Sequence, residues 1–430
     1  MNSTLTLDSA QAEAIPATAS SAEGGFYERL FFFAMRSMRH GCLRIVYPGG
    51  RVRLLGDGVS SPQAEMRLRD PRAFFRRCIL FGNIGFGESH TAGEWDTDDI
   101  AAVITWFIRN ITRSQGARAS SSRLPFTHLL RLGSRLWHFG RRNHESNSRR
   151  NISEHYDLGN DFYALWLDPT MTYSAARFEH AEQSLEDAQR AKYEALCRKL
   201  QLKPEDHVLE IGCGWGGFCT HAAREHGCRV TAVTISKEQF DYATARVLRE
   251  GLADRVTIQL QDYRHVEGRF DKICSIEMLE AVGGEFLDTW FAKCHSLLKP
   301  EGLLAFQAIT TPDCRHAALR KGVDWIQKHI FPGSLLLSVD QINRAANRTS
   351  DLFMHALEDL GSGYARTLKL WHDAFHARLD EVRAMGFSEA FIRKWSYYLK
   401  YCEAAFATRN ISVIQAVYTR PNNESLHRAW

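Results

Sequence analysis

Residues 208–218, with the sequence VLEIGCGWGGF, constrain the fold of this chain more than any other stretch. A run that favours a buried strand leads into a glycine-rich turn, and a helical pattern follows from about Phe218. Glycine lets the backbone turn sharply and approach a ligand without a Cβ atom in the way, and the helix start offers unpaired N–H groups. The G-x-G-x-G spacing differs from that of dinucleotide-binding folds. The stretch predicts a ligand-binding loop, with a purely structural turn as the alternative.

The second half of the chain alternates predicted strands with helical patterns. Strands are expected at residues 207–211, 229–234, 256–260, 272–276, 303–308 and 411–418. Helical patterns separate the first five, so we predict an α/β fold with a doubly wound, mostly parallel sheet. Such sheets bind ligands at the carboxyl ends of their strands. Polar residues follow the second and third strands there: Thr234, Gln239, Asp262 and Tyr263.

The first part of the chain has its own patterns. Residues 1–24 are rich in Ser, Ala and Thr, which predicts a disordered tail. Residues 25–112 are expected to form a smaller α+β domain. Its signals are a hairpin, with strands at 43–47 and 52–55 around a Pro-Gly-Gly turn, and helices at 71–80 and 98–107.

Residues 113–150 are strongly basic, with nine arginines and a single acidic residue, Glu145. Apolar residues there share one side of a short helix: Phe126, Leu129, Leu130, Leu136 and Trp137. Four arginines project elsewhere: Arg131, Arg135, Arg141 and Arg142. The segment is either a solvated, flexible linker or a basic amphipathic segment that lies on anionic lipid.

The composition limits the class of protein. Hydrophobic residues make up 44% and charged residues 24%, which is ordinary for a soluble chain. No apolar run approaches the roughly 18 residues of a membrane span, and the start lacks the features of a secretion signal. The ten cysteines are scattered without metal-site spacing, so we predict reduced thiols, a cytoplasmic location and no metal.

A set of motifs resembles the cyclopropane-fatty-acyl-phospholipid synthases, a family of S-adenosylmethionine-dependent methyltransferases that includes mycolic acid cyclopropane synthase-like members. The motifs are HYDLGNDFY (155–163), MTYS (171–174), LEIGCGWGG (209–217), TISKEQ (234–239), QDYR (261–264) and IFPG (330–333). GFGES (85–89) and GEWD (93–96) resemble the family's amino-terminal lipid-associated domain. The resemblance covers nearly the whole chain and implies a class I methyltransferase domain at 151–420, followed by a tail at 421–430.

The resemblance also implies which residues contact the cofactor. These are Tyr173, Ser174, Glu210, Gly212, Gly214, Gly216, Thr234, Gln239, Asp262 and Tyr263. Glu210 is the acidic residue two positions before the first glycine of the loop. Thr234 and Gln239 stand where an acidic residue usually binds the ribose. Asp262 is expected to accept from the adenine amino group, with a helix cap as the alternative.

The implied reaction transfers a methylene group from S-adenosylmethionine to the double bond of unsaturated acyl chains in membrane phospholipids. Attack by the double bond leaves a carbocation, and loss of one methyl proton closes the ring. The site therefore needs negative or π-rich groups, exclusion of water and a base. The resemblance implies bicarbonate as that base, with contacts from Glu280, Gln307, Tyr364 and the main chain of Ile309. Cys402 matches a cysteine once regarded as a nucleophile, and a packing role is its alternative.

Two positions depart from the family pattern: Ala175 replaces a cysteine, and Gln307 replaces a histidine that contacts the bicarbonate. Weaker anion binding would let the cation resolve without ring closure, and Glu277 offers a compensating carboxylate or has a structural role. The alternatives are therefore a C-methyltransferase that makes methyl-branched or methylene chains and a non-catalytic lipid-binding protein. The resemblance implies a homodimer, and we expect peripheral contact with the anionic inner face of the membrane. Because no N-P-P-[YF]-type motif is present, nucleic acid is not an expected partner.

Overall fold

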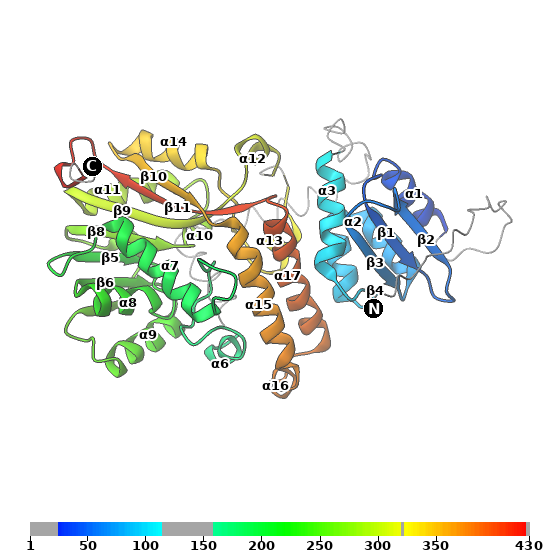
Figure 1. Cartoon of the computed structure of the whole chain (residues 1–430), viewed down its shortest axis with the longest axis horizontal. Helices are drawn as coiled ribbons and strands as arrows, with labels where there is room; N and C mark the ends of the chain where they lie inside the picture. Colours follow the sequence, from blue (N-terminus) through cyan, green and yellow to red (C-terminus); the bar gives the residue numbers. More distant parts are fainter. Residues whose placement is uncertain (1–24, 114–157, 320–321, 427–430) are drawn as a thin grey trace, which may run out of the picture.

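The computed structural model describes residues 25–113, 158–319 and 322–426 (Figure 1). The predicted tail at 1–24, nearly all of the basic segment at 113–150 and the first residues of the 155–163 motif lie outside this range. Within it, no helix combines the length and apolar character that a membrane span requires.

The part of the chain from residue 158 onward folds around a seven-stranded sheet with the order β10-β11-β9-β8-β5-β6-β7. The strands are His207–Ile211 (β5), Arg229–Thr234 (β6), Val256–Leu260 (β7), Phe270–Ile276 (β8), Leu298–Thr310 (β9), Phe353–Asp359 (β10) and Ser412–Thr419 (β11). The strands from β9 to β7 are parallel, and β11 and β10 pair antiparallel at one edge. The predicted α/β fold with a mostly parallel sheet is confirmed.

Helices cover both faces of this sheet. Leu304 and Phe306 of β9 pack in one apolar cluster with α11 (Leu287–Leu297) and α14 (Val339–Thr349). Leu303 and Ala305 pack on the opposite face with α7 (Leu185–Leu200) and α8 (Gly217–His226). The alternation follows from the two-residue period of a strand. It shows the doubly wound arrangement directly.

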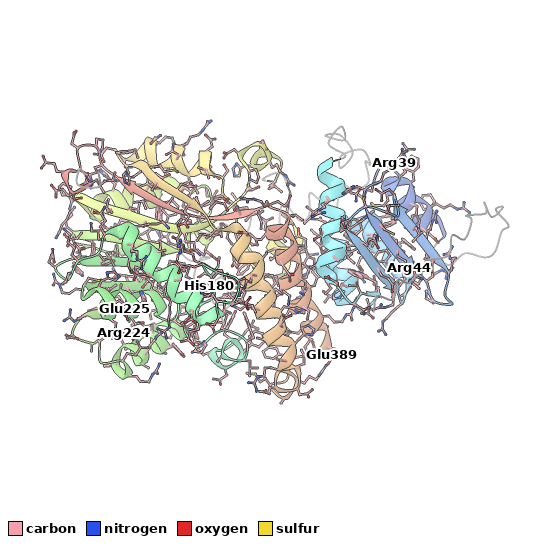
Figure 2. All side chains as sticks on the ribbon, viewed as in Figure 1. Arg39, Arg44, His180, Arg224, Glu225 and Glu389 are labelled. Atoms are coloured by element: carbon pink, nitrogen blue, oxygen red, sulfur yellow. The ribbon has the colours of Figure 1, made fainter. Side chains whose placement is uncertain are left out.

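Amphipathic sequences explain why these helices lie flat on the sheet. In α8, Ala222 and Ala223 are buried, whereas Arg224 and Glu225 are exposed (Figure 2). The remaining elements of this part are α6 (Asn160–Ala164), α9 (Lys237–Arg249), η3 (Tyr263–His265), α10 (Leu279–Val282), α12 (Asp313–Leu319), α13 (Trp325–His329), α15 (Gly361–Ala377), α16 (Leu379–Ala384), α17 (Glu389–Ala407) and η4 (Glu424–Leu426).

Residues 25–113 form a smaller α+β unit with a four-stranded sheet in the order β2-β1-β3-β4. Its elements are α1 (Gly25–Met35), β1 (Cys42–Val46), β2 (Val52–Gly56), β3 (Gln63–Leu68), α2 (Pro71–Thr91), β4 (Trp95–Asp96) and α3 (Ile100–Arg113). The predicted hairpin is confirmed, because β1 and β2 pair antiparallel. The parallel pairing of β1 with β3 was not predicted.

Helix α17 joins the two parts of the molecule. It packs against α15 on one side and against α2 and α3 on the other, as Figure 1 shows. Arg393 of α17 reaches the small unit, with Nη1 2.6 Å from Asp96 Oδ1 and Nη2 donating to the Trp95 carbonyl at 2.7 Å. This packing brings the helices of the small unit to the edge of the sheet where the candidate site lies.

Candidate active site

The glycine-rich turn joins β5 to α8 in a conformation that favours glycine. Gly212, Gly214 and Gly216 have φ values of 85°, 51° and 82°, which lie in the left-handed region. A Cβ atom at Gly212 would approach Met278 Cγ to 2.9 Å, whereas at Gly214 it would meet no atom within 4 Å. Helix α8 begins at Gly217, and its N-cap residue Gly216 has no side chain that could cap the first N–H groups, which lack intrahelical partners.

A cavity of about 1630 Å³ opens at the carboxyl ends of the parallel strands and extends to the small unit. The predicted cofactor residues line it, apart from Gly216. Glu280, Ile309, Tyr364 and Cys402 also line it, whereas Gln307 lies behind them and is fully buried. The structure thus brings the predicted residues together, and their individual roles stay predictions.

The polar residues after β6 and β7 are held by local hydrogen bonds. Thr234 Oγ1 donates to Gln239 Oε1 at 2.9 Å. Asp262 caps η3 by accepting from the Arg264 N–H, and Arg264 Nη2 lies 2.6 Å from Asp262 Oδ2. Burial opposes ionisation of Asp262, but the hydrogen bonds and charge of Arg264 hold its pKa below the usual value. The carboxylate is therefore ionised and caps η3, and because Asp262 also lines the cavity its contact with adenine stays a prediction.

Tyr173 and Ser174 are fixed by partners from distant helices. The hydroxyl groups of Tyr173 and Tyr398 lie 2.7 Å apart. Lys192 Nζ donates to Ser174 Oγ at 2.7 Å. Lys192 is fully buried in α7, and burial lowers its pKa to about 7. Lys192 was not predicted from the sequence, although a lysine in register with Ala188 and Leu196 of the buried helix face was a usable signal.

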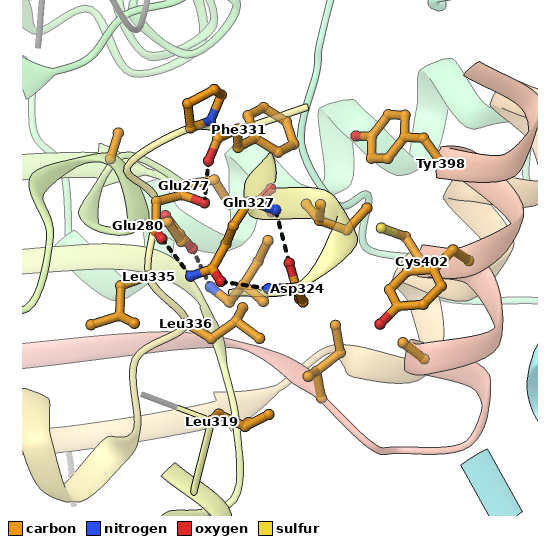
Figure 3. Close-up of a pocket in the computed structure, with 18 of the residues that line it drawn as sticks. Glu277, Glu280, Leu319, Asp324, Gln327, Phe331, Leu335, Leu336, Tyr398 and Cys402 are labelled. Carbon is orange, nitrogen blue, oxygen red and sulfur yellow. Dashed lines mark hydrogen bonds between the residues drawn. The ribbon is translucent and has the colours of Figure 1, made fainter. Parts of the chain in front are cut away.

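Two glutamates, Glu277 and Glu280, follow β8 and lie close together. Glu280 Oε1 accepts from the Ile309 N–H, while its Oε2 is enclosed and has no hydrogen-bond partner in the described part of the chain. Burial first, and then the charge of Glu277, raise the pKa of Glu280 to about 8. In Figure 3 both glutamates are drawn on the same side of the pocket as Leu335, and Tyr398 and Cys402 of α17 are drawn on the opposite side.

Glu277 is held by donors from three separate elements. Its Oε1 accepts from the Ala175 N–H at 2.8 Å and from Gln307 Nε2 at 2.7 Å, and its Oε2 accepts from the Tyr364 hydroxyl at 3.0 Å. Gln415 Nε2 in turn donates to Gln307 Oε1 at 3.0 Å and fixes the amide orientation. Gln307 and Tyr364 were predicted to hold bicarbonate, but here they hold a carboxylate of the chain itself.

The thiol of Cys402 lines the cavity from α17. Burial raises its pKa well above the usual value, with the charge of Asp324 adding to the shift. A thiol in such surroundings is a poor nucleophile, because the thiolate is the reactive form. These surroundings favour the packing role.

The residues fit S-adenosylmethionine but do not fit a bicarbonate bound by the four predicted groups. For the cofactor, the loop leaves room at Gly214, and the Oε2 atom of buried Glu210 is unpaired within the described ranges. Burial raises the pKa of Glu210 to about 8, so a cationic ligand would favour its ionised form. For bicarbonate, Gln307 and Tyr364 already donate to Glu277, and the Ile309 N–H donates to Glu280.

Comparison with known proteins agrees with this site. Residues 143–416 match the mycolic acid cyclopropane synthetase family. The chain is 39% identical to the tuberculostearic acid methyltransferase of Mycobacterium tuberculosis over 88% of each chain. It is 40% identical to the cyclopropane-fatty-acyl-phospholipid synthase of Escherichia coli over 84% of this chain and 89% of that protein.

Solved structures show the same fold. The cyclopropane synthase MmaA2 of Mycobacterium tuberculosis superimposes with a TM-score of 0.60 at 29% identity, covering 63% of this chain and 98% of that one. The mycolic acid cyclopropane synthase CmaA1, complexed with SAH and CTAB, gives 0.59 at 31% identity with the same coverage. The fold and site define an S-adenosylmethionine-dependent methyltransferase. More narrowly, the chain belongs to the mycolic acid cyclopropane synthetase family.

Proposed function

We propose that this protein is a cyclopropane-fatty-acyl-phospholipid synthase, which transfers a methylene group from S-adenosylmethionine to the double bond of an unsaturated acyl chain. The observation that carries the proposal is the single cavity that joins the glycine-rich loop to the small unit. Apolar side chains from three helices of that unit line its far part: Phe31, Met35, Ile79, Phe86, Ile104 and Phe107. An acyl chain in this part would place its double bond near the carboxylates after β8.

The residues of the site suit the chemistry of this reaction. When bound, S-adenosylmethionine supplies an electrophilic methyl group on a sulfonium centre. Glu210 and the loop residues hold the cofactor, while Glu277 and Glu280 provide negative charge close to the reacting carbons. The aromatic side chains of Tyr364 and Tyr398 enclose the same space and exclude water. Positive charge that develops on the acyl chain is thereby stabilised by groups already in place.

The finer predictions about partners belong to the same proposal. The small unit would bind lipid, and the basic segment at 113–150 would keep the protein at the anionic inner face of the membrane, in the cytoplasm. A homodimer is the expected assembly, which sedimentation of the full chain tests. Bicarbonate as the base stays a prediction of the family resemblance, and the hydrogen bonds around Glu277 and Glu280 do not favour it.

C-methylation without ring closure is the second candidate function. The similarity to the tuberculostearic acid methyltransferase supports it, as do Ala175 and Gln307 at positions where the resemblance predicts cysteine and histidine. A non-catalytic lipid-binding protein is disfavoured, because the glycine-rich loop, Glu280 and Tyr364 are all present.

Incubation of the purified full chain with S-adenosylmethionine and vesicles of monounsaturated phosphatidylglycerol tests the proposal. Both candidate reactions add one CH₂ to the acyl chain, so mass alone does not separate them. Ozonolysis does, because it cleaves a remaining double bond and leaves a cyclopropane ring intact. We expect an ozone-resistant product, and vesicles of saturated lipid as the control should gain no mass. An ozone-cleavable product of the same mass would instead establish C-methylation.

A further inference from the structure

We propose that the carboxylate of Glu277 is the base that removes the proton during ring closure, in the place where the family resemblance puts bicarbonate. The inference rests on the proposed function and names the proton acceptor of that reaction. It starts from the hydrogen bonds around the side chain: donors from β9, from α15 and from the segment before α7 converge on this one carboxylate.

Two of the three donors around Glu277 are groups that the family resemblance assigns to an anion site. Gln307 Nε2 and the Tyr364 hydroxyl were predicted to bind an anion, and they do so at 2.7 Å and 3.0 Å. Ala175 occupies a position where the resemblance predicts cysteine, and its main-chain N–H donates to the same carboxylate at 2.8 Å. The binding site for a small carboxylate-like anion is therefore complete, and the anion belongs to the chain.

The charges around Glu277 also disfavour a separate bicarbonate. A bicarbonate added beside Glu277 and Glu280 would place a third acidic group in a small enclosed volume, which like-charge repulsion opposes. The charge of Lys192, buried behind the site, instead supports the ionised form of Glu277. Burial opposes the effect of Lys192 and raises the pKa of Glu277. The raised pKa makes this carboxylate a stronger proton acceptor than an exposed one.

The backbone of Glu277 has an unusual conformation. Its φ value of 49° is left-handed, which is uncommon for a residue other than glycine. Its N–H donates to the Gln307 carbonyl at 2.8 Å and helps to hold this conformation at the end of β8. Strained backbone of this kind gathers at functional sites, where the surrounding structure enforces it. Here it places the side chain at the cavity wall.

The proton step is balanced without a further reactant. A C–H bond of the newly transferred methyl group breaks, and its proton moves to an oxygen of Glu277. The electron pair of that bond forms the second ring bond to the cationic carbon of the acyl chain. Glu277 is then neutral, and it returns the proton to solvent when the product leaves.

Turnover of the purified full chain on monounsaturated phosphatidylglycerol vesicles, with and without bicarbonate, tests this proposal. In buffers freed of carbonate, the parent protein should keep its rate within about twofold. Glu277→Gln preserves the shape but accepts no proton, so its rate should fall by about 10²-fold or more, the scale of a lost general base. Glu389→Gln, at an exposed position of α17, is the matched control and should behave like the parent (Figure 2).

A second variant guards against a merely structural effect. Glu277→Gly suits the left-handed backbone and vacates the carboxylate position next to Gln307 and Tyr364. It should be slow without carbonate, and added bicarbonate should restore its rate by at least tenfold while leaving Glu277→Gln unchanged. Calorimetry should show that both variants still bind S-adenosylmethionine, so a lost rate cannot be assigned to lost cofactor binding.

The outcomes separate the two proposals. Cyclopropane lipids that the parent forms only when bicarbonate is present would overturn the role of Glu277 and leave the proposed function standing. Turnover of Glu277→Gln at the rate of the parent would also overturn the role of Glu277 and leave the proposed function standing. A parent that yields only ozone-cleavable methylated lipids would overturn the proposed function, and the ring-closing role of Glu277 with it.

Discussion

Lowering the pH from 9 to 6 is expected to weaken the binding of S-adenosylmethionine, because carboxyl groups in the cavity must ionise to face a cation. Burial raises the pKa of Glu210 to about 8. Burial and the neighbouring Glu277 raise the pKa of Glu280 to about 8. A bound sulfonium favours the ionised form of each group and therefore lowers both pKa values.

The size of the effect follows from these values. A carboxyl group with a pKa near 8 is about nine-tenths protonated at pH 7, and its ionised fraction falls about tenfold for each pH unit below 7. The affinity should therefore rise as the pH rises to about 8 and level off above it. Below that point the dissociation constant should change about tenfold per pH unit for each carboxylate that must ionise.

Isothermal calorimetry in buffers of different ionisation enthalpy measures the protons released on binding. The amino group of the ligand titrates in the same range, so the comparison of parent with Glu280→Gln and Glu210→Gln carries the test. Each variant should release fewer protons at pH 7 than the parent and show a shallower pH dependence. Identical proton release and identical slopes in all three proteins would refute the reasoning.

Three further predictions concern the loop, the cysteine and the basic segment. Gly214→Val should weaken S-adenosylmethionine binding at least tenfold with unchanged circular dichroism, because a left-handed φ costs a β-branched residue about 1–2 kcal/mol or more and the new side chain enters the cavity. Gly214→Ala, with a smaller side chain, should lose less of the binding affinity. Cys402→Ala should keep kcat within about threefold in a turnover assay, and a loss of 10²-fold would restore the thiolate mechanism. Changing the four named arginines of the basic segment to glutamine should reduce cosedimentation with anionic vesicles and flatten its salt dependence, whereas equal cosedimentation at low salt would identify a linker.

The sequence predicted those parts of the fold that have a strong local signal. The central parallel strands β5 and β8 are mostly buried and appear as short apolar runs. Strands β5, β6 and the edge strand β7 match the predicted ranges residue by residue. Strand β10 was missed because its apolar pattern is weak: Phe353 and Leu357 are each 43% exposed, and the strand ends in Glu358 and Asp359. Strand β3 was missed as well, since its pairing with β1 is a long-range contact.

The candidate site was predictable in location but not in its contacts. Doubly wound sheets bind ligands at the carboxyl ends of their strands, and the glycine-rich loop after β5 indicates where along that edge the cofactor site lies. The resemblance then named Glu280, Gln307 and Tyr364 as neighbours. It did not indicate that Gln307 and Tyr364 turn to Glu277, because the three residues come from β9, α15 and the end of β8. Side-chain partners of this kind depend on tertiary packing, which no local pattern records.

S-adenosylmethionine carrying a trideuterated methyl group tests the central claim most directly. Ring closure removes one deuteron from the transferred methyl, so the acyl product should retain two deuterium atoms and resist ozonolysis. C-methylation that ends with loss of a chain proton would retain three, and a methylene product would retain two but be cleaved by ozone. Mass spectrometry of the acyl chains before and after ozonolysis distinguishes these products. Two retained deuterium atoms in an ozone-resistant chain are the predicted result, and three retained atoms or cleavage by ozone would contradict the account.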